Sequence, residues 1–466
     1  MARRASRGYC ARSSCCRDGA PREGARFRGV PTAKGERVDS VSDWATRYYV
    51  LLYEVVSVSP SKLRKLAQVS EVFTPGTPIS RYSIFAGRMD QIMEIVNATS
   101  NRGQHVVMYG ERGVGKTSLA NVLTEIFDAM GRTVLKYARI NCNSGDDFSS
   151  IWRNVGREID IEFGADPYAN LTPEDIRFGL SQQSRSLIVL DELDRFEDDD
   201  SLTLLADTIK SLSDHSIPAT VVLVGVADSI EQLLGDHASI ERNIVQVPMP
   251  RMREDELTEI VDNALQTLGM SISDRVKARI PSLSEGLPHY THLLGLHAFQ
   301  RAIQDDRSEV NGADVDAAIR IAVEKAQHSI RSAYQRATRS PHKDNLFAQV
   351  LLACALAPKD ELGYFAAGAV RIPMSQIMGR PYEIPAFARH LDQFTKEDRG
   401  YILSRRGPER MRFYRFENPM LQPFVILSGL SKGYIREEQI GGGPASRGAP
   451  DGPPQPDSLP HSSPLE

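Results

Sequence analysis

The chain has 466 residues, too many for one ordinary domain, and this length predicts about three units of roughly 100 to 200 residues each. The composition, 41% hydrophobic and 25% charged, is that of a globular protein. The formal net charge of −4 excludes a global attraction to nucleic acid, so any basic surface must be local.

Cysteine spacing and hydropathy exclude further classes. The five cysteines form no CxxC pair, so the sequence predicts neither a disulfide framework nor a zinc site and favours a reducing cytoplasm. The most apolar runs, which start at Tyr48 and Gln349, are far shorter than the ~20 residues that a membrane-spanning helix needs. We therefore expect no transmembrane segment and no membrane partner.

Both ends of the chain have compositions that do not favour folding. Residues 1–70 are expected to be largely disordered or poorly defined, because the first forty are rich in Arg, Ser and Gly and poor in aliphatic side chains. An organelle transit segment and an artefactual upstream start both remain open for this stretch. Residues 431–466 end in a Pro/Gly/Ser-rich composition and are predicted to be a disordered tail.

Residues 71–250 alternate short apolar runs with helical periods, which is typical of βα units on a parallel sheet. The predicted strands are 105–109, 133–141, 186–191, 219–227 and 243–248. The fold class predicted for this part is therefore α/β.

The P-loop pattern GxxxxGK[ST] occurs after the first predicted strand as GERGVGKT, and a predicted helix follows it. Its glycines allow backbone N–H groups to point at phosphates at the positive end of that helix. Lys116 would neutralise the β and γ phosphates, and the Thr117 hydroxyl would hold Mg²⁺. The residues expected to contact nucleotide here are Gly110, Glu111, Arg112, Gly113, Val114, Gly115, Lys116, Thr117 and Ser118.

The third predicted strand, LIVLDELD, ends on two acids at the sheet edge where the P-loop opens. Asp191 is placed to bind Mg²⁺ through water, and Glu192 is placed to orient and deprotonate an attacking water. The alternative is an acidic helix start that leads into the sequence RFEDDD.

Together these motifs resemble the AAA+ ATPases, and within them the origin-recognition-type initiators and their bacterial relatives, over about residues 73–427. The resemblance implies nucleotide base or ribose contacts at Phe85 and Arg88, within a segment before the P-loop. It also places Asp228 where the family carries a polar sensor, usually Asn, Ser or Thr. Arg242 stands where the family has an arginine finger that reaches a neighbouring subunit, so it is either a finger in a homo-oligomer or a surface arginine.

The strands disappear after Pro250, and residues 251–337 are predicted to be an all-α unit that resembles the AAA+ lid. One of its predicted helices runs uninterrupted through DVDAAIRIAVEKAQHSIRSAYQRA. Where the family's sensing helix normally begins with Gly and a nearby Arg, this chain has EGLPHY, similar to the GxP module of STAND-type switch ATPases. Pro288 either only starts a helix or packs on adenosine, and His289 either approaches the phosphates or has no role.

Residues 338–430 resemble a winged-helix domain. They contain a helical run through Leu356, the helix PAFARHLDQF, and two extended segments, YILSRR and MRFYRF, joined by the turn GPE. An arginine stripe on the wing would contact DNA phosphates, and Arg389 or His390 on the helix would read bases. Protein contact is the alternative use of the domain. The candidate nucleic-acid residues are Arg389, Arg405, Arg406, Arg410 and Arg412.

Three functions fit these predictions. The first is an ATP- and Mg²⁺-dependent hydrolytic switch that couples nucleotide state to duplex DNA through the winged helix. The second is a STAND-like signalling scaffold that gates protein assembly without DNA. The third, a small-molecule phosphotransferase, is disfavoured because Glu192 suits water activation. The guanine-specificity pattern TKED at 395–398 lies beyond the sheet and lid, so ATP is preferred to GTP.

Overall fold

The computed structural model describes residues 59–131, 136–166, 168–227, 242–341, 345–360, 362–408 and 411–440. The predictions for the first 58 and last 26 residues, for the start of the second strand, and for Asp228 and Arg410 therefore lie outside the described residues. Within the described part, the chain from Arg64 onward belongs to one compact unit. No helix in these ranges is both long enough and apolar enough to cross a membrane.

The α/β core is built on a five-stranded parallel sheet in the order β2-β3-β4-β1-β5. Its strands are β1 (His105–Gly110), β2 (Lys136–Asn141), β3 (Ser186–Asp191), β4 (Ala219–Val226) and β5 (Ile244–Pro248). Each of these overlaps a predicted strand, so the α/β fold class is confirmed. Because all five strands run parallel, their carboxyl ends meet at one edge, where β1 leads into the P-loop and β3 ends on Asp191.

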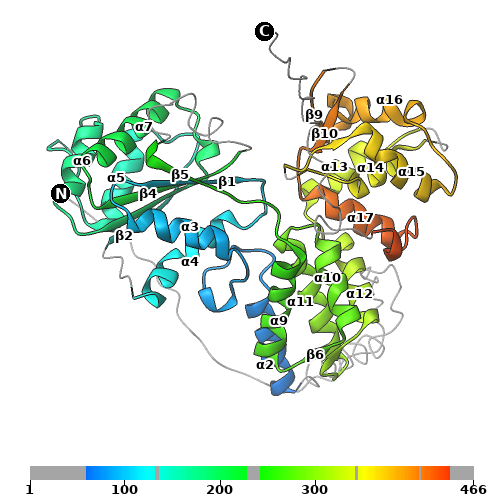
Figure 1. Cartoon of the computed structure of the whole chain (residues 1–466). Helices are drawn as coiled ribbons and strands as arrows, with labels where there is room; N and C mark the ends of the chain where they lie inside the picture. The colour runs from blue at the N-terminus through cyan, green and yellow to red at the C-terminus, as the bar shows by residue number, and fades with distance from the viewer. Residues whose placement is uncertain are drawn as a thin grey trace, which may run out of the picture. The chain divides into compact units, whose positions relative to one another are not determined.

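Helices cover both faces of this sheet, as parallel sheets require. Figure 1 shows α3 and α4 on one face and α5, α6 and α7 on the other. Alternate residues of β1 divide accordingly, because Val106 and Met108 belong to one apolar core and Val107 to the other. The bounds are α2 Pro60–Val72, α3 Met89–Ser100, α4 Lys116–Ala129, α5 Phe148–Ile159, α6 Pro173–Ser181 and α7 Asp199–Asp214.

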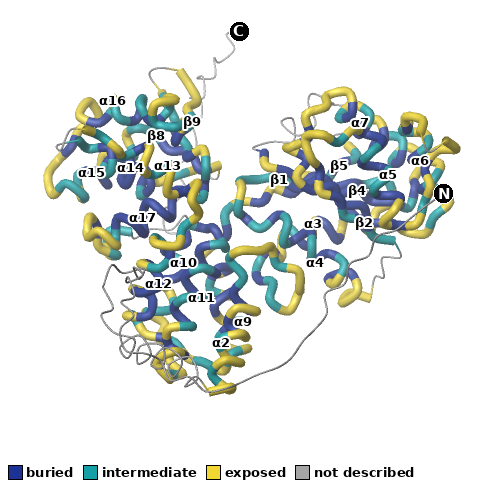
Figure 2. The backbone as a smooth tube through the Cα atoms, turned by 180° about the vertical axis from the view of Figure 1, so that it is seen from behind, coloured by how far each residue is buried: buried dark blue, intermediate teal, exposed yellow. Residues whose placement is uncertain are grey.

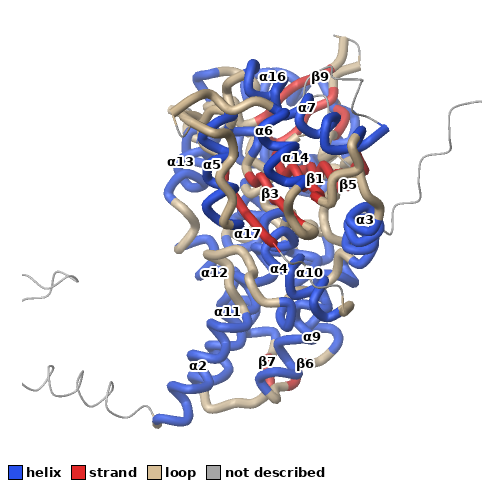
Figure 3. The backbone as a smooth tube through the Cα atoms, turned by 90° about the vertical axis from the view of Figure 1, so that its left-hand side faces the viewer, coloured by secondary structure: helices blue, strands red, loops and turns tan. Residues whose placement is uncertain are grey.

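The predicted helical unit is present as five helices: α9 (Glu254–Leu268), α10 (Asp274–Ser284), α11 (Pro288–Gln304), α12 (Gly312–Glu324) and α13 (His328–Thr338). The predicted single helix across α12 and α13 is wrong, because the chain becomes extended at Gln327, with φ −51° and ψ 142°. This break lets α13 turn away to pack against the C-terminal helices. A two-residue parallel ladder, β6 (Ser271–Ile272) with β7 (Glu309–Val310), was not predicted (Figure 3).

The C-terminal region has the winged-helix arrangement. Helices α14 (Phe347–Leu356), α15 (Arg371–Met378) and α16 (Ile384–Phe394) accompany a three-stranded antiparallel sheet in the order β8-β10-β9. The strands are β8 (Phe365–Ala366), β9 (Leu403–Arg406) and β10 (Phe413–Phe416), and α17 (Leu421–Ser431) follows. Figure 2 shows α14 and α17 largely buried.

Two expected boundaries differ from the structure. Helix α2 begins at Pro60, inside the stretch expected to be poorly defined. Beyond α17, Ile435 is buried and Glu437 pairs with Arg279 of α10, so residues 432–440 are held to the helical unit rather than forming a tail. The domain limits 71–250, 251–337 and 338–430 stay predictions.

Gly295 of α11 provides a test of how the segment before the P-loop is held. A Cβ at Gly295 would lie 2.3 Å from the ring of Phe73, which is 1% exposed and packs on Phe299. We expect Gly295→Ala to lower the free energy of unfolding by about 1 to 3 kcal/mol through overpacking, although alanine favours a helix. Gly368→Ala, where nothing lies within 4 Å, is the control. A Gly295→Ala protein as stable as the parent in urea unfolding would contradict this packing.

Candidate functional site

The P-loop connects β1 to α4 through three glycines in the left-handed region. Gly110, Gly113 and Gly115 have φ values of 152°, 89° and 98°. A Cβ at Gly110 would lie 2.3 Å from the Met249 carbonyl oxygen, so no larger residue fits there without displacing backbone. At Gly115 nothing lies within 4 Å of such a Cβ, so the loop is open at that point. The described residues thus form a backbone cradle that suits a phosphate.

Lys116 is the first residue of α4 and is 8% exposed. Its Nζ donates to the carbonyl oxygens of Gly110 and Glu111, at 2.8 Å each. Burial lowers the pKa of this amine to about 8, although the charges of Asp194, Asp191 and Glu111 oppose the shift. A phosphate bound in the cradle would supply a negative charge beside this buried ammonium group.

The acid pair stands at the end of β3, as predicted. Asp191 is 2% exposed; its Oδ2 accepts a 2.7 Å bond from Arg139 and its Oδ1 accepts the Glu192 N–H. Glu192 has a φ of 58°, which is uncommon for a residue other than glycine. Such strained backbone concentrates at active sites, where the surrounding structure holds it. The Glu192 carboxylate is half exposed and bonded to Arg195 at 2.7 Å, so it is accessible to water.

Two further residues of this edge were not predicted. Arg139 lies on β2, which pairs with the acid strand β3, and the available signal was an arginine within a predicted strand. Asp194 accepts the N–H of Val226 at 2.8 Å and so joins the acid loop to the end of β4. The predicted sensor Asp228 lies just past that strand, outside the described residues.

The segment before the P-loop supports the loop backbone. Arg88 is 3% exposed and donates to the carbonyl oxygens of Val114 and Pro250, at 2.8 and 2.7 Å. Burial lowers the pKa of its guanidinium to about 10. Phe85 is half-buried and packs against the main core. Arg88 therefore lies beside the P-loop, and a contact with nucleotide stays a prediction for both residues.

Pro288 occupies the first turn of α11, as its helix-start signal predicted. The His289 Nδ1 lies 2.7 Å from the Pro75 carbonyl oxygen, to which a ring N–H donates. Burial lowers the pKa of this imidazole. Nearby, the His292 Nδ1 accepts the Thr74 N–H at 3.3 Å. The two histidines thus hold the segment before the P-loop on α11, and the approach of His289 to phosphate stays a prediction.

A polar network joins the P-loop to the helical unit and to α17. The Glu111 carboxylate, 9% exposed, accepts a 2.8 Å bond from the Nε of Arg251. Arg251 also donates to the side-chain oxygen of Gln422 at 2.7 Å and to the backbone oxygen of Glu285. Gln422 in turn donates to the Glu285 carboxylate at 2.7 Å. The P-loop also packs closely on the residue before α17, because a Cβ at Gly113 would lie 2.8 Å from the Met420 sulfur.

Arg242 is exposed just before β5 and lies 3.5 Å from an Asp214 carboxylate oxygen. This exposed position is compatible both with an arginine finger that reaches a second copy and with a plain surface arginine.

The other predicted P-loop residues differ in exposure and contacts. Val114 is buried, Arg112 is exposed, and the Ser118 hydroxyl accepts the Ile79 N–H at 3.1 Å.

The wing arginines meet carboxylates within their own domain. Arg405 and Arg412 both approach Asp392, at 3.6 and 2.7 Å, and Arg406 pairs with Asp360 at 3.1 Å while stacking on Tyr364. On α16, Arg389 is exposed. The described wing is therefore less positive than its arginine count suggested.

The residues proposed for Mg²⁺ are a hydroxyl and a carboxylate, which are the oxygen ligands that this ion prefers. Thr117 is half-buried in the first turn of α4, and Asp191 is buried at the same sheet edge. Among the described residues no group of three or more His, Cys, Asp or Glu side chains could hold a metal ion. This donor set fits an ion that keeps most of its ligands from phosphate and water.

The pKa of Lys116 predicts how phosphate binding depends on pH. Above about pH 8 the amine loses its proton, so the affinity for a nonhydrolysable ATP analogue should be roughly tenfold lower at pH 9 than at pH 7. Calorimetric titration from pH 7 to 9.5 measures this fall while the phosphates stay ionised. Lys116→Arg, charged throughout, should show no such fall; a parent affinity independent of pH would contradict the assignment.

Residues 99–234 match a family model described as an AAA domain. No curated protein gives a significant match to the chain. Among solved structures, the chain is similar to Cdc6p from Pyrobaculum aerophilum, at 15% identity over 79% of this chain and 99% of that one, with a TM-score of 0.42. The chain is also similar to the Aeropyrum pernix ORC2 protein, at 16% identity over 78% of this chain and 98% of that one, with a TM-score of 0.44. The Aeropyrum pernix ORC1 protein in complex with DNA matches at 16% identity over 77% of this chain and 95% of that one, with a TM-score of 0.41.

The family match covers β1, the P-loop, the acid pair and β4, which are the elements that form the site. Residues 99–234 thus have a P-loop fold that matches the AAA domain model, and a helical unit and a winged helix follow them.

Proposed function

We propose that this protein is a switch that binds ATP with Mg²⁺ and hydrolyses it slowly. The observation that carries the proposal is the meeting of the glycine cradle, Lys116, Asp191 and the strained Glu192 at one edge of the parallel sheet. In the proposal, Thr117 and Asp191 hold Mg²⁺, which would neutralise phosphate charge when bound. Glu192 orients and deprotonates the attacking water. Phe85, Arg88, Pro288 and His289 surround the nucleotide.

The Glu111–Arg251–Gln422 contacts support a switch rather than a simple hydrolase. A phosphate that displaces the Lys116 bonds to Gly110 and Glu111 would disturb the same loop that Arg251 ties to α17. Because buried polar groups lose much when one partner is removed, the network favours discrete arrangements over gradual ones. Nucleotide state would thereby reach the winged helix.

For the output of the switch we propose duplex DNA, contacted through the wing and α16. Arg405 and Arg406 are 43% and 46% exposed, and exposed ion pairs are weak enough to exchange a carboxylate for a DNA phosphate. Arg412, at 22% exposed and 2.7 Å from Asp392, is held more firmly. Arg242 acts in trans on the nucleotide of a second copy if the chain forms nucleotide-dependent oligomers.

A STAND-like scaffold without DNA is the second candidate, and the pairing of the wing arginines with Asp360 and Asp392 favours it. The two candidates differ in what ATP changes. The scaffold should change its mass in light scattering between ATP and ADP and should not bind DNA at low salt.

Hydrolysis is tested at Glu192. Glu192→Gln should keep ATP affinity and lose turnover by about 100-fold or more, because the amide cannot accept a proton from water. Glu197→Gln, an exposed acid of the same loop, should leave both unchanged. Phosphate release and analogue titration measure the two quantities. If Glu192→Gln hydrolyses ATP at the parent rate, the catalytic assignment is wrong.

The DNA output is tested by titrating duplex DNA over a salt series. Affinity should fall with salt, and Arg405→Gln/Arg406→Gln should weaken binding and reduce the slope of log K against log[salt] by about 2, because two phosphate contacts are lost. Arg412→Gln should have a much smaller effect, since Asp392 already engages that side chain. The absence of binding at low salt, or equal slopes for parent and double variant, would favour the scaffold.

A further inference from the structure

We propose that the groove between α13 and the end of α16 binds a small ligand that carries two or more phosphate groups. The groove is distinct from the P-loop and has a volume of about 980 Å³. This is within the size of small-molecule sites, which run from roughly 300 to 1,000 Å³. Its lining residues are Ser332, Gln335, Arg336, Arg339, Ser340, Pro341, Gln393, Lys396, Asp398 and Arg399.

The groove concentrates positive charge on a chain that is negative overall. Arg336, Arg339, Lys396 and Arg399 line it, and Asp398 is its one carboxylate. In the part of the chain that the structure describes, no ion pair neutralises Arg336, Arg339 or Lys396. The wing differs, because its described arginines are each engaged by an aspartate or stacked on Tyr364. Like charges gathered without counter-charges favour a multivalent anion.

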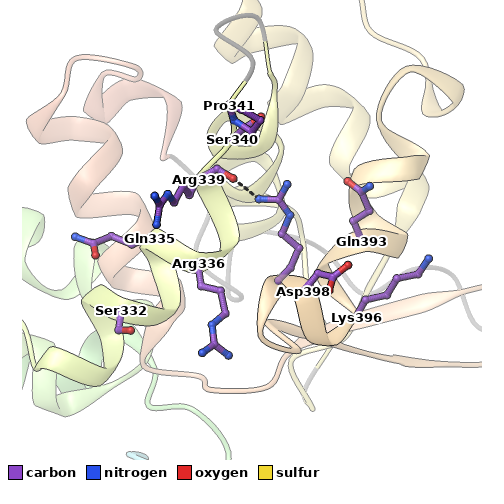
Figure 4. Close-up of a pocket in the computed structure, with 10 residues that line it drawn as sticks. Ser332, Gln335, Arg336, Arg339, Ser340, Pro341, Gln393, Lys396 and Asp398 are labelled. Carbon is purple, nitrogen blue, oxygen red and sulfur yellow. Dashed lines mark hydrogen bonds between the residues drawn. The ribbon is translucent and has the colours of Figure 1, made fainter.

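The cations stand on two opposite walls. Figure 4 shows Ser332, Gln335 and Arg336 on α13, Arg339 just past its end, and Gln393, Lys396 and Asp398 across from them. A single small anion would meet one wall, whereas a chain of phosphates can meet both. Gln335 and Gln393 add amide donors, which bond phosphate oxygens without further charge.

Arg399 gives the groove a fixed base. It donates to the carbonyl oxygens of Ala337 and Arg339, at 3.1 and 2.5 Å, and its guanidinium lies 3.6 Å from the centre of the Phe347 ring. The residue therefore already ties η5 (Glu397–Arg399) to the end of α13. A ligand that contacts both walls would strengthen this connection between the helical unit and the winged helix, at the C-terminal end of α13.

The TKED sequence, which nucleotide specificity did not explain, supplies two of the lining side chains, Lys396 and Asp398. It sits here because α16 ends at Phe394 and the chain turns through η5 toward β9. The motif thus has a place in the proposed site that owes nothing to guanine recognition.

Sodium tripolyphosphate is the probe, used without Mg²⁺ on the whole chain in a Lys116→Ala background, which removes the lysine of the P-loop cradle. Calorimetry and thermal unfolding should show binding and a higher Tm than sodium chloride of equal ionic strength gives. Arg336→Gln/Arg339→Gln should weaken binding by about tenfold for each arginine removed. Arg336→Lys/Arg339→Lys should restore part of it, and Arg320→Gln, an exposed arginine of α12, should change nothing.

Several outcomes would overturn the site. Binding that disappears in Lys116→Ala belongs to the P-loop, and binding that survives in the glutamine pair does not use this groove. Binding of duplex DNA at these arginines without binding of tripolyphosphate would make the groove a DNA contact instead. Because the background variant already lacks Lys116, failure of the ATP switch would leave this result unaffected, and the lysine pair separates loss of charge from loss of folding.

Discussion

The contact on which the arrangement of the site depends is the ion pair between Arg251 and Glu111. It joins the P-loop to the segment between β5 and α9, and the same guanidinium reaches Gln422 of α17. Both charged groups are largely buried, so each relies on the other; a buried charge left alone costs several kcal/mol. In the proposed switch, these shared bonds would favour discrete arrangements of the P-loop and α17 over gradual ones.

The P-loop is built around buried cations that lack a full complement of anions. Lys116 is held by backbone carbonyls alone, and Arg88 donates to two more, while Arg139 engages Asp191. Burial lowers the pKa of Lys116 and of Arg88, so the folded chain pays for keeping these charges out of water. A bound polyphosphate would stabilise the charged forms of these side chains. The electrostatics of this sheet edge therefore favour nucleotide binding.

Sequence reasoning succeeded wherever one local rule decided the outcome. The strands β1 and β3, the helix start at Pro288 and the pair of strands of the wing follow from hydrophobic period, turn residues and proline geometry. Sequence-based prediction failed where a contact with residues distant in the sequence determined the local structure. The break at Gln327 has no proline or glycine to announce it; it exists because α13 packs against the C-terminal helices. The partners of His289 and of the wing arginines are likewise set by residues far along the chain.

The order of residues was enough to determine that a phosphate cradle and an acid pair exist and lie at one sheet edge, because parallel strands place their carboxyl ends together. Only the tertiary structure decided which charges remain available for a ligand. Asp392 and Asp360 engage the wing arginines, whereas Arg336, Arg339 and Lys396 line a groove and form no ion pair among the described residues. Charge pairing depends on distances of a few ångströms between segments that are remote in sequence, and no local pattern of residues records those distances.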